Sequence, residues 1–242
     1  MKNKLHLILL TIAPLCGCNC GLGEYTYDKA DQYVEYKEPV TIDNNDLSSL
    51  VIHWVSGNVS VVQKDEPLSF SEKTTRGNYL PLYYRQFNTG VEIEYIKSGT
   101  KNSAYNNMSK DLVVVVPLTY TDIYINTVSA NSDLSLQNLN ELDVNTVSGG
   151  CKAEINQVKT ASLDTVSGNV DLTIADVSIL GSIHIDSVSG DGHLYLDPSR
   201  GYQLNFDTIS GTAKKNFEKT DSNPYNIFFD SVSGNLIIDE KQ

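Results

Sequence analysis

Apolar and polar positions in the C-terminal half of the chain repeat with a period of about twenty residues. In the clearest copy, Leu163-Asp164-Thr165-Val166-Ser167-Gly168-Asn169-Val170-Asp171-Leu172, apolar and polar residues alternate on both sides of a Val-Ser-Gly phrase. The serine of the phrase recurs at steps of 19, 19, 22, 21 and 23 residues: Ser129, Ser148, Ser167, Ser189, Ser210 and Ser233. An outlying copy is His53-Trp54-Val55-Ser56-Gly57-Asn58. Such a period predicts a solenoid, in which each repeat stacks on its neighbours.

The length of one repeat requires corners. Twenty extended residues would span about 65 Å, which is too long for one strand. In the copy at residues 183–196 the alternation slips between Ile185 and Val188, and again between Gly190 and Gly192, so the chain changes face there. We therefore predict an all-β, single-stranded parallel β-solenoid whose coils of 19–23 residues stack about 4.8 Å apart.

The section between the outlying copy and the regular repeats breaks the period. We predict a hairpin in which residues 82–87 and 91–96 flank Asn88-Thr89-Gly90, an exposed loop from Ser98 to Lys110, and a strand ending at Pro117. The predicted solenoid domain covers residues 47–242, with irregular strands over 60–120 and regular coils over 121–242.

The repeated serines lack the partners that a catalytic nucleophile requires. A catalytic serine needs a histidine and an orienting acid beside it, whereas His53, His184 and His193 occupy polar positions of different repeats. A small Ser-Gly pair suits a tight corner stacked on identical corners. We predict structural serines, no catalytic residue and no cofactor.

Two polar columns follow from stacking in register. One is a hydroxyl ladder of Thr127, Thr146, Thr165, Ser187, Thr208 and Ser231. The other is Asn126, Asn145, Asp164, Asp186, Asp207 and Asp230, whose side chains we expect to cap the turn amides. Adjacent carboxylates could instead hold Ca²⁺, but a metal site should be local and not serial, so the cap is favoured and no metal site is predicted.

The net charge and the cysteine content argue against a nucleic-acid partner and against a disulfide-rich fold. The formal charge of −12 disfavours a nucleic-acid partner, which would need a basic face. If residues 1–17 are removed as a signal peptide, only Cys18, Cys20 and Cys151 remain, so we predict no disulfide framework. Cys151 occupies the slot of Val170 in the next repeat, so we predict a buried thiol.

The N-terminus has the pattern of a signal peptide: Lys2 and Lys4 precede an apolar stretch over residues 5–15 that is too short to cross a bilayer. The following Leu15-Cys16-Gly17-Cys18 resembles the lipobox of bacterial lipoproteins. That resemblance implies cleavage after Gly17 and lipidation of Cys18. The alternative is an ordinary secretory signal. We assign residues 1–17 to the signal peptide and 18–46 to a tether.

The strand that ends at Pro117, followed by Ile-x-Ile-x-Thr-Val-Ser-Gly-x-Val-x-Leu repeats over residues 50–242, resembles the bacterial putative-adhesin β-solenoid families of unknown function. The resemblance implies a right-handed parallel solenoid and a lipid-anchored protein of the bacterial cell envelope, at the outer membrane or cell surface. We expect a non-catalytic binding or scaffolding role, with a glycan or an envelope protein as partner.

Two other functions stay open. A polysaccharide-active enzyme would need a local cluster of carboxylates and a basic residue, but the acids are evenly spread and Arg76, Arg85 and Arg200 are isolated. The second open function is that of a partner protein in envelope stress or signalling. Tyr83, Tyr84, Tyr95 and Tyr105 could line a binding groove, although tyrosines on strands more often pack.

Overall fold

The computed structural model describes residues 23–37, 40–42, 46–219 and 222–241. Within these residues the chain is almost entirely β-structure, with one α-helix, α1 (Asn102–Tyr105), and one 3₁₀ turn, η1 (Ala30–Gln32). The prediction of an all-β protein is confirmed. None of the helices in the described residues has the length and apolar character that a bilayer crossing requires.

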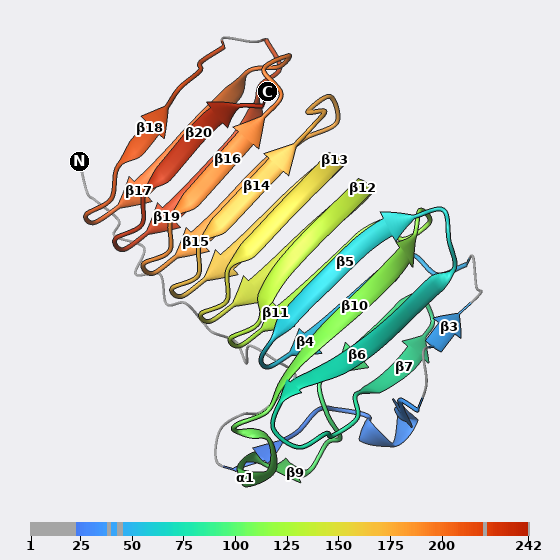
Figure 1. Ribbon diagram of the computed structural model, residues 1–242. Coiled ribbons are helices and arrows are strands. Elements are labelled where there is room, and N and C mark those ends of the chain that lie inside the picture. The colour runs from blue at the N-terminus through green and yellow to red at the C-terminus, as the bar shows by residue number, and fades with distance from the viewer. Residues whose placement is uncertain (1–22, 38–39, 43–45, 220–221, 242) are drawn as a thin grey trace.

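The strands form two facing rows with the core between them (Figure 1). We define the front row, in spatial order, as β6 (Leu68–Arg76), β10 (Ser109–Pro117), β5 (Asn58–Lys64), the first halves of β12 (Asn131–Thr146) and β13 (Cys151–Thr165), β14 (Val170–Ile174), β16 (Gly192–Leu196), β20 (Leu236–Glu240) and β18 (Ala213–Lys215). The back row is β7 (Tyr83–Phe87), β8 (Gly90–Glu94), β4 (Ser49–Trp54), β11 (Asp122–Thr127), the second halves of β12 and β13, β15 (Ser182–Ser187), β19 (Tyr225–Ser231) and β17 (Tyr202–Thr208).

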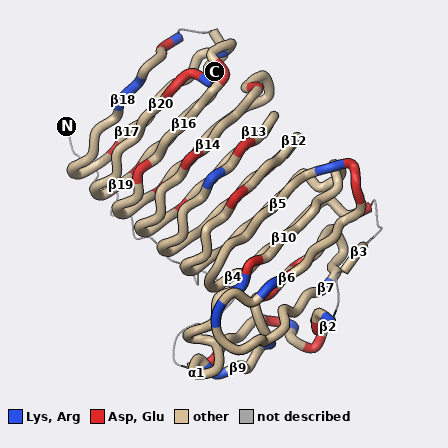
Figure 2. The backbone as a smooth tube through the Cα atoms, in the orientation of Figure 1, with Lys and Arg blue, Asp and Glu red and all other residues tan. Residues whose placement is uncertain are grey.

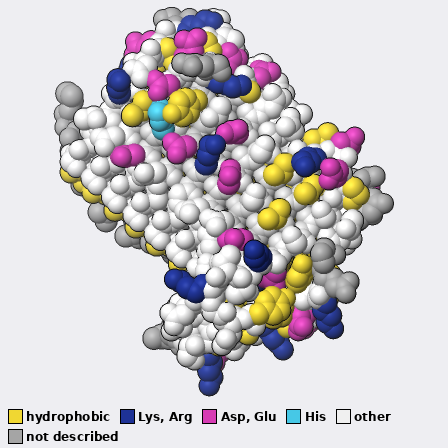
Figure 3. Space-filling view, in the orientation of Figure 1, with side chains coloured by type: hydrophobic (Ala, Val, Ile, Leu, Met, Phe, Trp, Pro, Cys, Tyr) yellow, Lys and Arg dark blue, Asp and Glu magenta, His cyan; other side chains and the backbone are white. Residues whose placement is uncertain are grey.

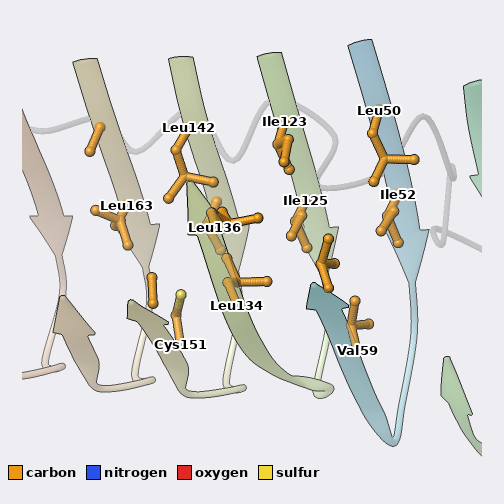
Figure 4. Close-up of a cluster of buried hydrophobic side chains, with 14 of the residues drawn as sticks. Leu50, Ile52, Val59, Ile123, Ile125, Leu134, Leu136, Leu142, Cys151 and Leu163 are labelled. Atoms are coloured by element: carbon orange, nitrogen blue, oxygen red, sulfur yellow. The ribbon is translucent and has the colours of Figure 1, made fainter. Parts of the chain in front are cut away.

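Alternating apolar side chains fill the space between the rows. Figure 4 shows Leu50 and Ile52 of the back row facing Val59 and Leu134 of the front row. Cys151 pairs in register with Val170 and is buried, as the sequence predicts. The period-two alternation therefore directs one face of every strand inward.

A Val-Ser-Gly corner joins each back strand to the next front strand, and the corners stack closely. A Cβ atom on Gly149 would lie 1.8 Å from the carbonyl oxygen of Ala130, and one on Gly168 would lie 1.9 Å from that of Gly149. Neither glycine has a positive φ. Glycine is needed here because the backbones approach each other closely, not because of a left-handed conformation.

Parallel pairing in register holds from β4–β5 to the C-terminal coils, but the spatial order of the last two coils differs from the chain order. The strands β19 and β20 pair with β15 and β16 on one side and with β17 and β18 on the other. The coil formed by β17 and β18 is therefore the last in space (Figure 1). Because every corner carries the same phrase, the phrase itself does not specify this order.

At the N-terminal end the pairing is mixed, so the molecule is not a single parallel stack. In the front row β10 is parallel to β5 but antiparallel to β6, which pairs antiparallel with β3 (Val40–Ile42). In the back row β7 and β8 form the predicted hairpin, and β2 (Val34–Glu35) pairs antiparallel with β7. The outlying copy is a regular coil, since β4 and β5 pair with β11 and β12.

A buried ion pair lies beneath this end. Lys110 Nζ lies 2.6 Å from Glu72 Oε2, and both side chains are fully buried. Lys110 also accepts, through its carbonyl, a hydrogen bond of 2.8 Å from Trp54 Nε1. Lys110 therefore does not lie in an exposed loop as predicted: Ser98 to Lys110 includes β9 (Thr100–Lys101) and α1. Trp54 stands at the head of the hydroxyl column, in register with Thr127.

The described part of the predicted tether packs on the body. Within residues 18–46, β1 (Glu24–Tyr25) pairs with β9, β2 pairs with the hairpin strand β7, and β3 pairs with β6. Tyr25 and Tyr27 are buried. Residues 1–17 and Cys18 lie outside the described residues, so the signal peptide and the lipidation stay predictions.

The close stacking predicts that a substitution by alanine destabilises the protein at Gly149 but not at the adjacent Gly150. Gly149→Ala places a Cβ against backbone, and we expect the free energy of unfolding to fall by about 1–3 kcal/mol. Gly150→Ala is the matched control, because its Cβ would meet nothing closer than 3.6 Å. Urea unfolding of both variants checks this. Equal stability of the two variants would contradict the stacking.

Candidate functional site

The repeated serines are structural. Each corner serine that the sequence singles out donates its hydroxyl to a carbonyl in the adjacent corner: Ser148 to Val128 at 3.3 Å and Ser167 to Val147 at 3.3 Å. In the described residues their hydroxyls bond to these carbonyls and not to a histidine. These serines therefore bind one corner to the next and are not placed as nucleophiles.

The column of Thr and Ser hydroxyls closes the corners. Thr146 Oγ1 accepts the amide of Gly149 at 3.0 Å, and Thr165 Oγ1 accepts that of Gly168 at 2.7 Å. Ser187 does the same for Gly190. The prediction that the Asp/Asn column caps these amides is therefore wrong, because the hydroxyl three residues before each amide points inward at the corner and takes that role.

The Asp/Asn column forms a ladder on the outer face of the back row. Register places Asn145 beside Asp164, then Asp186, Asp230 and Asp207. Burial, together with the charges of Asp186 and Asp143, raises the pKa of Asp164 to about 7. The Oδ1 atom of Asp164 is buried without a hydrogen-bond partner in the described residues. The ladder therefore costs stability wherever these carboxylates ionise.

The outer face of the front row carries a groove instead of a ladder. It has a volume of about 860 Å³ and is lined by eight residues of five neighbouring coils: Lys152, Glu154, Thr173, Tyr195, Asn216, Asp239, Glu240 and Lys241. Figure 3 shows charged side chains, a histidine and hydrophobic side chains gathered over the C-terminal coils of this face, while much of the rest is white. Figure 2 shows the charges on these strands and an uncharged corner edge.

Register explains the hollow. Glu154, Thr173, Tyr195 and Asp239 stand side by side on β13, β14, β16 and β20. Thr173 is the smallest of these, so it forms a low point between two longer neighbours. At the rim Lys152 Nζ lies 2.8 Å from Glu154 Oε1, and both side chains are mostly exposed. The groove is open to solvent and polar on both sides.

A hydrogen-bonded chain orders the aromatic wall of the groove. His193 Nε2 lies 2.7 Å from Asp239 Oδ2, and Tyr195 Oη lies 3.1 Å from His193 Nδ1. The rings of His193 and Tyr195 stack with centroids 4.1 Å apart. Hydrogen bonds from Asn216 and His193 lower the pKa of Asp239. The tyrosine ring is thus presented in a fixed orientation.

This arrangement escaped the sequence analysis. His193 and Asp239 are 46 residues apart and meet because β20, not β18, stacks on β16. The tyrosines proposed from sequence as a groove do not form one, since Tyr95 and Tyr105 are buried and Tyr83 donates to Glu35. The Lys214-Lys215 pair lies on the terminal strand β18, where lysines disfavour pairing with another chain.

Comparisons with known proteins agree with this architecture. A family model described as Toastrack DUF4097 matches residues 37–238. Among solved structures, a "putative cell adhesion protein" from Clostridium sporogenes ATCC 15579 resembles the chain with a TM-score of 0.51 at 14% sequence identity, over 86% of this chain and 100% of that chain. At that identity the likeness concerns the fold alone. No curated protein matches the chain.

The ladder predicts a pH dependence that one substitution removes. Because the pKa of Asp164 in the folded state is about 7, above its ordinary value of 3.8, the folded state binds the proton more tightly than the unfolded state does. The stability that this proton contributes is lost as pH rises from about 4 to about 7. Asp164→Asn, which repeats the residue found at Asn145, should therefore gain on the order of 1–2 kcal/mol over the parent at pH 8 and little at pH 4, after allowance for solvent screening.

Chemical unfolding of both chains at several pH values measures this difference. Asp65→Asn, at an exposed turn between β5 and β6, is the matched control and should leave the pH profile unchanged. A constant difference between parent and Asp164→Asn across the pH range would contradict the prediction.

Proposed function

Because the chain belongs to the Toastrack DUF4097 family, a domain family of unknown function, we propose that it is a non-catalytic, adhesin-like protein that binds a glycan in the front-row groove. The observation that carries the proposal is the groove itself, with the ordered Tyr195 ring beside opposed charged and amide groups. Ligand sites combine an apolar or aromatic surface with a few placed polar groups that fix orientation. Tyrosine supplies both in one side chain.

The charges indicate which glycan fits. The groove mixes Lys152 and Lys241 with Glu154, Asp239 and Glu240, and the whole chain carries a formal charge of −12. A strongly anionic polysaccharide would meet repulsion from the chain as a whole. We therefore propose an uncharged or amino-bearing polysaccharide as the ligand.

The cellular setting of the proposal comes from the N-terminal sequence and from the adhesion-type relative. A lipid-modified Cys18 would hold the protein on a membrane of the bacterial envelope, because acyl chains contribute about 0.8 kcal/mol per buried CH₂. We propose an outer-membrane or cell-surface location on this basis, and right-handed winding of the parallel coils on the general preference for that hand.

A catalytic role for the same groove is the second candidate, and the Tyr195–His193–Asp239 chain is the observation that favours it. A tyrosine held by a histidine–carboxylate pair could transfer a proton. In the described residues the hydrogen bonds of His193 go to Asp239 and Tyr195 and to no serine or cysteine, so the chain of hydrogen bonds holds no activated serine or cysteine nucleophile. The binding function is therefore preferred.

Binding to immobilised envelope polysaccharides tests the proposal. We expect Tyr195→Ala to weaken binding roughly tenfold, equivalent to about 1.4 kcal/mol, because the ring supplies the stacking surface. Thr173→Trp should also block binding by filling the low point of the groove. Tyr124→Ala removes a half-buried tyrosine from the outer face of the back row and is the matched control, with unchanged affinity expected.

Three outcomes would overturn the proposal. The first is binding that Thr173→Trp and Tyr195→Ala leave intact. The second is the absence of binding to any uncharged or amino-bearing glycan, with an envelope protein captured instead. The third is release of new reducing ends or unsaturated products by the parent chain and not by His193→Ala, which would establish the enzyme in place of the binding protein.

A further inference from the structure

A second cluster of titratable side chains lies far from the groove, on the outer face of the back row near its N-terminal end. His53 of β4 stands in register with Glu94 of β8, and Glu92 lies two residues earlier on the same face of β8. His53 Nε2 is 3.3 Å from Glu92 Oε1 and 4.0 Å from Glu94 Oε1. These three ligand atoms all lie within 4.8 Å of one another. We propose that the cluster is a binding site for a first-row transition-metal dication such as Zn²⁺.

The spacing of the three atoms suits such an ion. Tetrahedral Zn²⁺ with nitrogen and oxygen ligands at about 2.0–2.1 Å places neighbouring ligand atoms roughly 3.3 Å apart. The pair His53–Glu92 already has this separation. Glu94 Oε1 has to approach His53 Nε2 by less than 1 Å, and the two carboxylate oxygens lie within 4.8 Å of each other. An imidazole with two carboxylates is a donor set typical of Zn²⁺ and its neighbours, whereas Ca²⁺ and Mg²⁺ prefer oxygen alone.

Each carboxylate is held by an outer partner that leaves one oxygen facing the histidine. Arg85 Nε donates to Glu92 Oε2 at 2.8 Å, and Tyr25 Oη donates to Glu94 Oε2 at 2.7 Å. In both glutamates the other oxygen, Oε1, is the atom nearest His53. Hydrogen bonds of this kind orient metal ligands and are a regular part of metal sites.

Burial makes the histidine itself informative. His53 is only 7% exposed, and its Nδ1 has no hydrogen-bond partner in the described residues. The imidazolium and a neutral ring bound to a cation through Nε2 both carry a proton on Nδ1. The cation therefore replaces the second proton of the ring, on the side that faces the two glutamates.

The net negative charge of the cluster attracts a cation. Glu92 and Glu94 together carry two negative charges, and Arg85 offsets one of them. Glu92 and Arg85 are 14% and 16% exposed, which leaves a route from solvent. The site is independent of the groove, because it lies on the other row.

Metal titration of the purified full-length chain tests the site. Equilibrium dialysis against Zn²⁺ should give one tightly bound ion per chain, and Co²⁺ should give the visible absorption bands of a tetrahedral centre. With free Zn²⁺ at about 100 times Kd, the melting temperature should rise by roughly 5–10 °C. His53→Gln and Glu94→Gln should each weaken binding at least roughly tenfold.

The matched control is His184→Gln. His184 lies on the same outer face, stacked on Phe228 and hydrogen-bonded to Ser182, and its loss should leave the affinity for Zn²⁺ unchanged. Circular dichroism identifies a variant that fails to fold, in which case Glu92→Gln and the Co²⁺ spectrum of the parent decide. No stoichiometric uptake, an octahedral Co²⁺ spectrum, or Zn²⁺ binding that survives His53→Gln would overturn the proposal.

Discussion

The close approach of one corner backbone to the next is the constraint on which the rest of the structure depends. Gly149 and Gly168 lie so near the carbonyl of the preceding corner that a single methyl group does not fit. The same approach lets Ser148 donate its amide to Val128 at 3.0 Å, and lets Ser167 do the same to Val147. Each such bond contributes about 0.5–1.5 kcal/mol net, and the spacing repeats in every coil.

Because the spacing between coils is fixed, a residue that recurs in each repeat forms a column. Once the corners are in register, every strand position lies beside its counterpart in the neighbouring coils, so a repeated residue becomes a ladder. Valines and leucines that face inward build the core without strain. The same rule places Asp164 beside Asp186 on the outside, where desolvation and mutual repulsion raise the pKa of the first. The repeat that stabilises the interior therefore produces an acidic face as its consequence.

The sequence predicts the features that follow from the regular repeat and does not predict the departures from it. The all-β class, the corner positions and the burial of Cys151 follow from alternation and its slips, and all are found. The exchange of the last two coils was not predicted. The corner phrases at 209–211 and 232–234 differ only in Ile for Val, so they carry no information on which coil stacks on β16. The structure at the N-terminal end was not predicted, because Lys110 is buried against Glu72. Charged residues are seldom fully buried, so the sequence around Lys110 indicates an exposed loop.

The exchange of coils also decides where a binding groove can form. If the coils stacked in chain order, β18 would lie against β16, and Lys214 would stand beside His193 in place of Ile237. The carboxylate of Asp239 would then be one coil further away, and the chain from Tyr195 through His193 to Asp239 would be broken. The groove thus depends on β19 and β20 inserting between two coils that precede them in the chain. A regular repeat supplies the scaffold, and the one departure from its order brings together the residues that a ligand would meet.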